Sequence, residues 1–168
     1  MGEILTGSDS NFPILASIMF DFTSIHKGTA MSNIDPQRHQ FDHFKSLPRD
    51  NPIEMLNLIR LKAIASYPDE KTTTGAEAYR RYFVESAPIF QRGGGQIIWR
   101  GNPNCVVIGP SDEHWDIAFI ARYPSAAEFL AMVTDSEYQS IVFHRQAAVA
   151  DSRLIRCEEE SSLGVGFS

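Results

Sequence analysis

The stretch from His114 to Cys157 constrains the fold of this chain more than any other part of the sequence. Its first segment, HWDIAFIARY, has the apolar pattern of a strand, and two capping boxes, SAAE at Ser125 and TDSE at Thr134, predict two consecutive helices after it. The short segment RLIRC predicts a closing strand at a sheet edge. We expect the upstream elements to pack against this unit of strand, helix pair and strand.

The upstream sequence adds a helix, a strand, a second helix and the two strands of a hairpin, at residues 35–47, 53–61, 74–93, 96–100 and 104–108. We expect Asp35 to cap the first helix, and Thr74 to open the second in a capping box with Glu77. The resulting order is the split β-α-β pattern of an α+β, ferredoxin-like sheet with helices on one face.

The two central strands, 53–61 and 115–121, are apolar on both of their faces. The predicted helices are too few to cover both sides of the sheet, so one side has to be buried against something else. A second copy of the same sheet is the simplest candidate, because a homodimer pairs one surface patch with itself. The sequence therefore predicts a homodimer.

The composition of the chain argues against several classes of protein. A chain of 168 residues, 43% of them hydrophobic, is long enough for one domain with a sizeable core. Nucleic-acid binding needs a clustered excess of basic residues, whereas 15 Lys and Arg against 21 Asp and Glu give a formal net charge of -6. No apolar run approaches the roughly 20 residues of a membrane span, and neither Cys105 nor Cys157 has zinc-site spacing. We expect a cytoplasmic protein with no nucleic-acid or membrane partner, no metal and no cofactor.

Five segments carry a resemblance to a known family: PIEMLNLIRL, GAEAYRRY, GGGQIIWRG, HWDIAFIARYPSAAEFLAMVTDSEYQ and HRQAAVADSRLI. In this order and spacing they resemble the bacterial domain-of-unknown-function family 1330 (DUF1330), over roughly residues 33–158. The resemblance implies a dimeric α/β barrel, in which two ferredoxin-like sheets face each other. The wider superfamily includes small monooxygenases, haem-handling enzymes and lactone isomerases, and none of these supplies a catalytic motif that can be placed here residue by residue.

The sequence divides into three parts. Residues 1–32 are expected to be an N-terminal extension, either an arm or a disordered segment; residues 33–158 form the ferredoxin-like dimeric α/β barrel domain; residues 159–168 form a C-terminal tail. A further hypothesis is that translation starts at Met31, where the character of the sequence changes. Mass spectrometry that found Met1 at the natural N-terminus would exclude this hypothesis.

Six residues are candidates for a functional site because they are polar or aromatic within apolar surroundings. His144, Arg145 and Asn57 are the candidate catalytic residues, and Trp99, Arg100 and Trp115 the candidate ligand-binding residues. No segment has the spacing of a metal site or of a nucleophile with its base.

Each candidate also has a structural alternative. His144 is a possible general base, since imidazole titrates near neutral pH, or it lies on an exposed helix face. Arg145 binds a carboxylate group of a ligand or forms an ion pair with Asp151, and Asn57 faces a cavity or bonds to the neighbouring backbone. The structural alternative for Trp99 and Trp115 is that they anchor the core or a dimer interface, as tryptophans more often do. Glu85 is a possible acid without a paired carboxylate.

Two functions are compatible with these residues. The first is binding of a small apolar or carboxylated compound, or its conversion by a cofactor-independent enzyme, in the barrel or in the cleft between sheet and helices. The alternative is a non-catalytic homodimeric structural module, in which the apolar sheet face serves assembly alone.

Overall fold

The computed structural model describes residues 32–69 and 72–159, which belong to the unit Ser32–Ser168. The predictions for residues 1–31, including the start at Met31, and for the tail from residue 160 onward lie outside the described residues.

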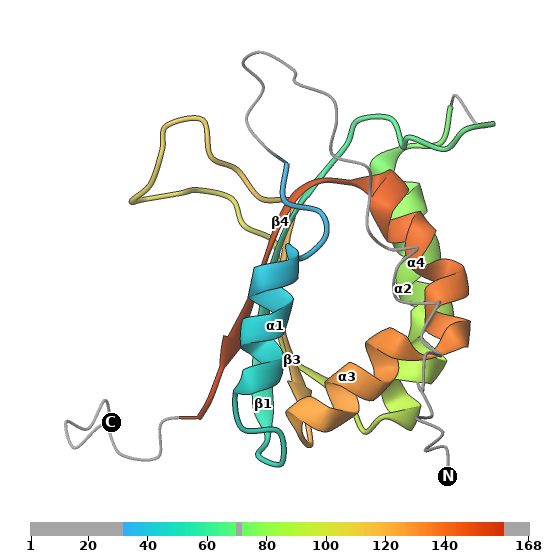
Figure 1. Cartoon of the computed structure of the whole chain (residues 1–168). Coiled ribbons are helices and arrows are strands. Elements are labelled where there is room, and N and C mark those ends of the chain that lie inside the picture. The colour runs from blue at the N-terminus through green and yellow to red at the C-terminus, as the bar shows by residue number, and fades with distance from the viewer. Residues whose placement is uncertain (1–31, 70–71, 160–168) are drawn as a thin grey trace, which may run out of the picture. The chain divides into compact units, whose positions relative to one another are not determined.

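Helices and strands follow one another along the described chain, coloured from blue to red in Figure 1. They are α1 (Arg38–Ser46), β1 (Ile53–Leu61), α2 (Gly75–Arg92), β2 (Gln96–Gly101), β3 (Ile117–Tyr123), α3 (Ala126–Thr134), α4 (Ser136–Ala148) and β4 (Val149–Cys157). The strands form one antiparallel sheet in the order β2-β3-β1-β4. This α+β, ferredoxin-like arrangement confirms the predicted fold class, with β4 at the expected sheet edge.

Two of the helix starts are made by the predicted caps. The hydroxyl of Thr74 accepts a hydrogen bond from the backbone N–H of Glu77 at 3.1 Å, and the Glu77 carboxylate accepts from the backbone N–H of Thr74 at 2.8 Å. At the start of α3, Ser125 Oγ accepts from the backbone N–H of Glu128 at 3.1 Å. These bonds satisfy amides that have no partner within the helix.

Two other predicted caps are wrong. Asp35 does not cap α1, which begins after a box formed by Gln37 and Gln40; instead, Asp35 Oδ2 accepts from the Gln146 side chain at 3.1 Å. Thr134 does not cap α4 either, because its hydroxyl donates back to Leu130 O at 2.8 Å and so belongs to the last turn of α3. The next residue, Asp135, caps α4.

The predicted hairpin between residues 96–100 and 104–108 is also wrong. Residues 102–116 contain no strand, and β2 pairs directly with β3. Strand β3 also pairs with β1, so it is held from both sides. Segment 104–108 would be a new edge strand with β2 as its only neighbour, whereas the pairing with β3 joins β2 to the rest of the sheet.

Helices α2, α3 and α4 cover one face of the sheet, as Figure 1 shows. The buried core on this helix side includes Ile53, Met55 and Ile59 of β1 together with Ala121 and Tyr123 of β3. The predicted placement of the helices on one face is thus confirmed.

The opposite face of the sheet carries an apolar row that no described helix covers. Trp99 pairs with Ile120, Ile120 with Leu56, and Leu56 with Ile155, so one side chain from each of the four strands points to the same side. Trp99 is 51% exposed and Ile155 46% exposed. We call this surface, formed by Leu56, Leu58, Trp99, Ile120 and Ile155, the outer face.

Candidate functional site

A pocket of about 290 Å³ opens where α2, α4 and the loop after β1 meet. It is lined by Tyr67, Pro68, Asp69, Arg81, Phe143 and His144, and we call it the His144 pocket. Helix α4 supplies the histidine and Phe143, α2 supplies the arginine, and the loop after β1 supplies the other three. Of the residues predicted from the sequence, His144 is the one that lines it.

Both ring nitrogens of His144 face a partner. The Tyr67 hydroxyl forms a short hydrogen bond with Nδ1, and Glu85 Oε2 lies 3.5 Å from Nε2. The histidine side chain is 13% exposed, so the ring is largely shielded from water. The phenol ring of Tyr67 stands edge-on to the imidazole, with the ring centres 5.6 Å apart.

These contacts set the direction in which protons can move. A carboxylate accepts hydrogen bonds only, so Nε2 carries the hydrogen when it faces Glu85, and Nδ1 is then free to accept from the Tyr67 hydroxyl. In this tautomer His144 can take the phenol proton, and the Glu85 carboxylate stabilises the imidazolium that forms. Tyr67, His144 and Glu85 thus form a continuous chain of polar contacts along which a proton can move, and we call this chain the relay.

The pocket walls combine an apolar surface with a cation. Phe143 lies at a ring-centre distance of 4.0 Å from His144, and the Arg81 guanidinium lies 5.8 Å from the centre of the Tyr67 ring. An arginine beside an aromatic wall can bind a carboxylate group whose apolar part lies against the rings. The arrangement therefore suits a small carboxylated compound.

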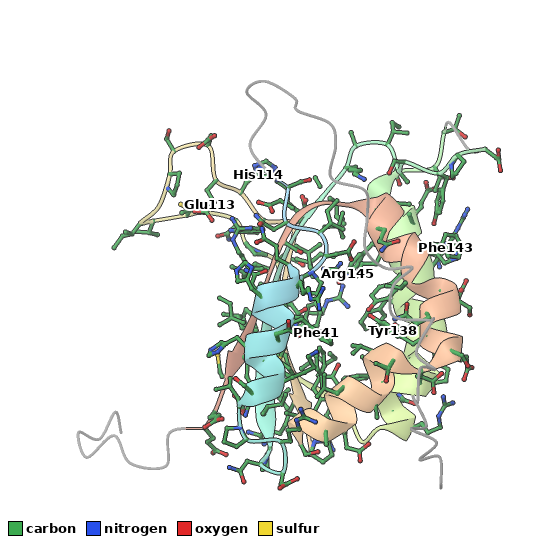
Figure 2. All side chains as sticks on the ribbon, viewed as in Figure 1. Phe41, Glu113, His114, Tyr138, Phe143 and Arg145 are labelled. Atoms are coloured by element: carbon green, nitrogen blue, oxygen red, sulfur yellow. The ribbon has the colours of Figure 1, made fainter. Side chains whose placement is uncertain are left out.

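Arg145 lies on a different side of α4 from the pocket. In Figure 2 it points toward the sheet, whereas Phe143 lies on the opposite side of the helix. Its guanidinium donates to Ile34 O at 2.6 Å and to Ser152 Oγ at 3.0 Å. These bonds fasten the segment before α1 to β4.

The predicted ion pair between Arg145 and Asp151 is wrong. Asp151 pairs across the ladder with Arg60, on the outer-face side of the sheet, whereas Arg145 reaches the helix side. The Asp151 carboxylate is engaged by the backbone N–H of Asn33 at 2.9 Å and by Arg153 at 2.9 Å. Burial opposes its ionisation, but these donors outweigh burial and lower the pKa of Asp151.

The other four candidates are dispersed. Asn57 lies on the helix side of β1, and its side chain donates to Met55 O at 2.8 Å. This is the predicted alternative in which Asn57 bonds to the neighbouring backbone. Trp99 belongs to the outer face, while Arg100 lies on the helix side with its guanidinium 5.5 Å from the centre of the Phe83 ring. Trp115 is buried at the foot of the β2–β3 loop. The six residues do not form one site.

A cluster of buried tyrosines lies between α2, α4 and the sheet. The hydroxyls of Tyr82 and Tyr138 are 2.8 Å apart. Burial raises the pKa values of Tyr79, Tyr123 and Tyr138 well above the usual value, so these phenols stay neutral at physiological pH. The cluster packs the core of the domain.

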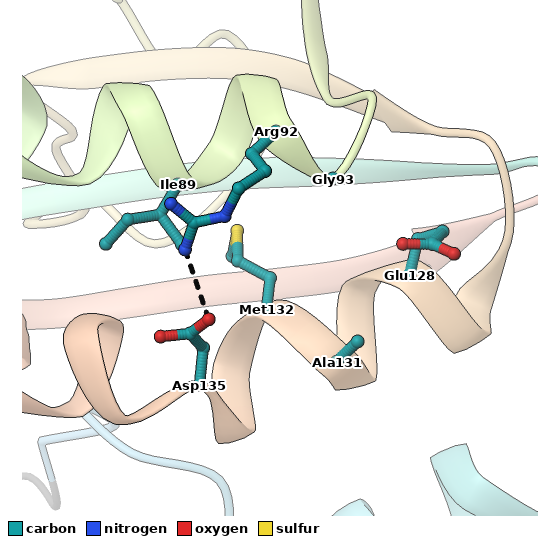
Figure 3. A pocket seen from close by; sticks show the side chains of 7 residues that line it. All are labelled: Ile89, Arg92, Gly93, Glu128, Ala131, Met132 and Asp135. Carbon is teal, nitrogen blue, oxygen red and sulfur yellow. Dashed lines mark hydrogen bonds and ion pairs between the residues drawn. The ribbon is translucent and has the colours of Figure 1, made fainter.

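A second, smaller pocket of about 140 Å³ lies between the end of α2 and α3 (Figure 3). Its lining includes Ile89, Met132 and Arg92. The Arg92 guanidinium is engaged by Asp135 at 3.2 Å and by Glu137 at 3.0 Å. Arg92 thereby holds the end of α2 to the start of α4. We assign no ligand to this pocket.

Among the described residues, no group of three or more His, Cys, Asp or Glu side chains is placed to hold a metal ion. Within the same ranges no helix combines the length and the apolar character needed to cross a membrane.

Known families and structures give the following similarities. The family described as a domain of unknown function (DUF1330) matches residues 69–157. The crystal structure of RPA0582, a protein of unknown function from Rhodopseudomonas palustris, is 51% identical with a TM-score of 0.75, over 79% of this chain and 100% of that chain. The methylated RPA0582 structure is 50% identical with a TM-score of 0.75, over 77% of this chain and 96% of that chain.

More distant similarity adds nothing on activity. SnoaB, a cofactor-independent oxygenase from Streptomyces nogalater, is 12% identical with a TM-score of 0.44, over 67% of this chain and 97% of that chain. That likeness is too weak to bear on chemistry. Among curated proteins, none matches the chain significantly.

Proposed function

The chain belongs to DUF1330, a family defined as a domain of unknown function, and on that premise we propose that it binds a small carboxylated compound in the His144 pocket and transfers a proton there without a cofactor. The observation that carries the proposal is the relay in which His144 lies between Tyr67 and Glu85 at the pocket wall.

Arg81 and the aromatic wall define the ligand class. The guanidinium binds the carboxylate of the ligand, and Phe143 with Pro68 covers its apolar part. Asp69 also lines the pocket, and its negative charge disfavours a ligand with a second carboxylate.

The proton transfer is balanced by groups of this chain. An acidic proton of the ligand passes to the Tyr67 oxygen while the phenol proton passes to His144 Nδ1, and Glu85 compensates the new positive charge. Return of the proton to a different atom of the ligand completes an isomerisation. Neither an oxidant nor a reductant is consumed.

The binding part of the proposal is tested with benzoate as a probe. Benzoate is expected to raise the melting temperature of the full chain, and the variants Arg81→Gln and His144→Gln should lose this rise. The control is His39→Gln, which changes an exposed histidine of α1 and should keep it. A rise of the same size in wild type and His144→Gln would place the binding elsewhere and contradict the proposal.

The chemical part is tested with phenylpyruvate, a carboxylate with an acidic C–H bond. In D₂O the protein should accelerate deuterium uptake at that carbon, and Tyr67→Phe should reduce the acceleration by about 100-fold or more, the usual contribution of a positioned acid–base group. Equal uptake with wild type and with Tyr67→Phe would exclude the relay.

Assembly is the second function that a specific observation favours. The apolar outer face, with Trp99 and Ile155 half exposed, supports a homodimer in which two sheets face each other. Sedimentation of the full chain should show a dimer at micromolar concentration, and Trp99→Lys with Ile155→Lys should convert it to a monomer. A wild-type monomer at that concentration would contradict the homodimer.

A further inference from the structure

The loop of residues 102–116 is much longer than the connection between β2 and β3 requires. These strands are antiparallel neighbours, which a turn of about two to five residues can join. The loop contains neither helix nor strand. Loops of this length without helix or strand are uncommon in compact domains, and they are usually either functional or disordered.

The tip of the loop is apolar and projects into solvent. Val107 is 88% exposed and Ile108 94% exposed, and among the described residues no large apolar side chain is more exposed than these two. Two adjacent branched side chains that are exposed to water do not stabilise the single chain. Covering them with a second surface is favourable, because it removes apolar area from water.

The foot of the loop is fixed to the sheet. Trp115 is 9% exposed, and its Nε1 donates to Glu113 Oε1 at 3.1 Å. Arg153, which pairs with Leu58 on the outer-face side, lies 5.2 Å from the Trp115 ring. The backbone N–H of Asp116 donates to Ile59 O at 2.8 Å and so extends the sheet by one bond.

This foot directs the loop away from the helices. In Figure 1 the loop, drawn in yellow, extends from the sheet on the side opposite to α2 and α4. Figure 2 labels Glu113 and His114 on its returning limb, on that same side. The loop therefore projects from the side of the sheet on which the outer face lies.

The loop is long enough to cross to a second sheet. At about 3.3 Å per residue, the limb of residues 102–107 has a maximum extended length of roughly 20 Å and the limb of residues 108–116 one of roughly 30 Å. Facing sheets pack about 10 Å apart. The tip can therefore reach the surface of the facing copy.

Charges on the outer-face side are compensated within one chain. Arg122 donates to Glu54 at 3.1 Å and lies 3.9 Å from Glu159. Arg153 donates to Asp151 at 2.9 Å, and Arg60 lies 3.9 Å from the same carboxylate, so three arginines are matched by three carboxylates. Two identical faces can therefore approach without bringing unpaired like charges together. A second copy of this chain fits the surface better than a partner of strong net charge.

We propose that residues 102–116 form an exchange arm: in the homodimer, the Val107–Ile108 tip of each copy docks on the outer face of the other copy. The arm rests on the homodimer proposed above and adds to it a reciprocal contact. Because each copy contributes one tip, two equivalent contacts close the dimer from both sides.

The first test replaces the tip with Val107→Ser and Ile108→Ser in the full chain. Sedimentation should show a dimer dissociation constant at least about tenfold higher than that of wild type, because four apolar side chains per dimer lose their cover. The matched control is Val84→Ser, which changes a 60% exposed side chain of α2 and should leave the constant unchanged. Since the tip is almost wholly exposed in the single chain, circular dichroism should show an unchanged fold.

The possible results distinguish a failure of the exchange-arm proposal from a failure of the homodimer proposal. A wild-type dimer whose constant is unchanged by the tip substitutions would overturn the arm and leave the homodimer intact, whereas a wild-type monomer would overturn both. A photoreactive benzoylphenylalanine at position 107, in dimers mixed from light and heavy isotope-labelled chains, gives an independent readout. Cross-links between light and heavy chains at the outer face support the arm, and cross-links confined to one chain contradict it.

Discussion

His144 is the residue on which the proposed chemistry depends, because both of its ring nitrogens face a partner. With Glu85 at Nε2 and the Tyr67 hydroxyl at Nδ1, the ring is held in one orientation, and the neutral tautomer with its hydrogen on Nε2 satisfies both contacts. Such a fixed imidazole can pass a proton without first reorienting. The neighbouring residue, Arg145, faces the opposite way and stabilises the fold.

Asp151 gives a prediction on stability and pH. Hydrogen bonds lower its pKa below the ordinary 3.8, so the ionised carboxylate stabilises the folded state above that pH, and this stabilisation is lost as the pH falls toward the lowered pKa. Asp151→Asn should reduce the free energy of unfolding at pH 7 by about 1–3 kcal/mol. The difference from wild type should shrink below about pH 4, as thermal melts across the pH range would show.

The control for this prediction is Asp50→Asn, which changes an exposed carboxylate. It should alter the melting temperature little at any pH, since exposed substitutions usually change stability by less than about 0.5 kcal/mol. A difference between Asp151→Asn and wild type that stays constant down to pH 2 would show that the charge of Asp151 has no stabilising role.

At the scale of single elements, α2 positions Glu85, a member of the relay, and Arg81, which lines the same pocket. Arg81 and Glu85 are four residues apart and so lie on the same side of this helix, toward α4. The helix is fixed at its start by the capping box of Thr74 and Glu77. The backbone N–H of Thr74 donates a hydrogen bond to the Glu77 carboxylate and has the largest part in lowering its pKa; the Thr74 hydroxyl, which also donates to it, has the next largest.

Thr74→Ala should destabilise the protein by about 1 kcal/mol, because it leaves an amide of the first turn without its acceptor. Chemical denaturation measures this loss. The matched control is Thr72→Ala, two residues earlier and exposed, which should have an effect close to zero. Equal effects of the two substitutions would mean that the box does not stabilise α2.

Local sequence patterns predict the elements whose signals are local. Strand β1 and the caps at Thr74 and Ser125 depend on neighbouring residues, and the structure confirms them. The predicted hairpin at 104–108 is wrong because strand pairing depends on distant partners: β2 pairs with β3, and residues 104–108 lie in the loop that connects them. Asp151 was assigned the wrong partner for a similar reason, since the pleat places it on the side of the sheet away from Arg145.

The candidate site was predictable only in part. His144 and Glu85 stand out as titratable residues on helices, and the structure brings them within 3.5 Å of each other. The sequence does not single out Tyr67 or Arg81 as site residues. Tyr67 lies in a loop without a recognisable motif, and 77 positions separate it from His144 along the chain. No spacing pattern reports a contact that the tertiary fold alone creates.

At the scale of the whole domain, the sheet separates two surfaces with different chemistry. The His144 pocket lies on the side of the helices, between α2, α4 and the loop after β1, whereas the outer face lies on the other side of the sheet. Figure 1 shows the loop of residues 102–116 on the side of the sheet opposite to α2 and α4. Packing of two outer faces therefore leaves both pockets open to solvent. Assembly and ligand binding can proceed independently in such a dimer.

The central claim is that small carboxylates bind on the helix side, at the relay, and not on the sheet. It is tested most directly by NMR chemical-shift mapping of benzoate on the isotope-labelled full chain. The account predicts shifts that cluster at Tyr67, Arg81 and His144, including both ring nitrogens of the histidine. Shifts that cluster at Trp99 and Ile155, or no shifts at millimolar benzoate, would contradict it.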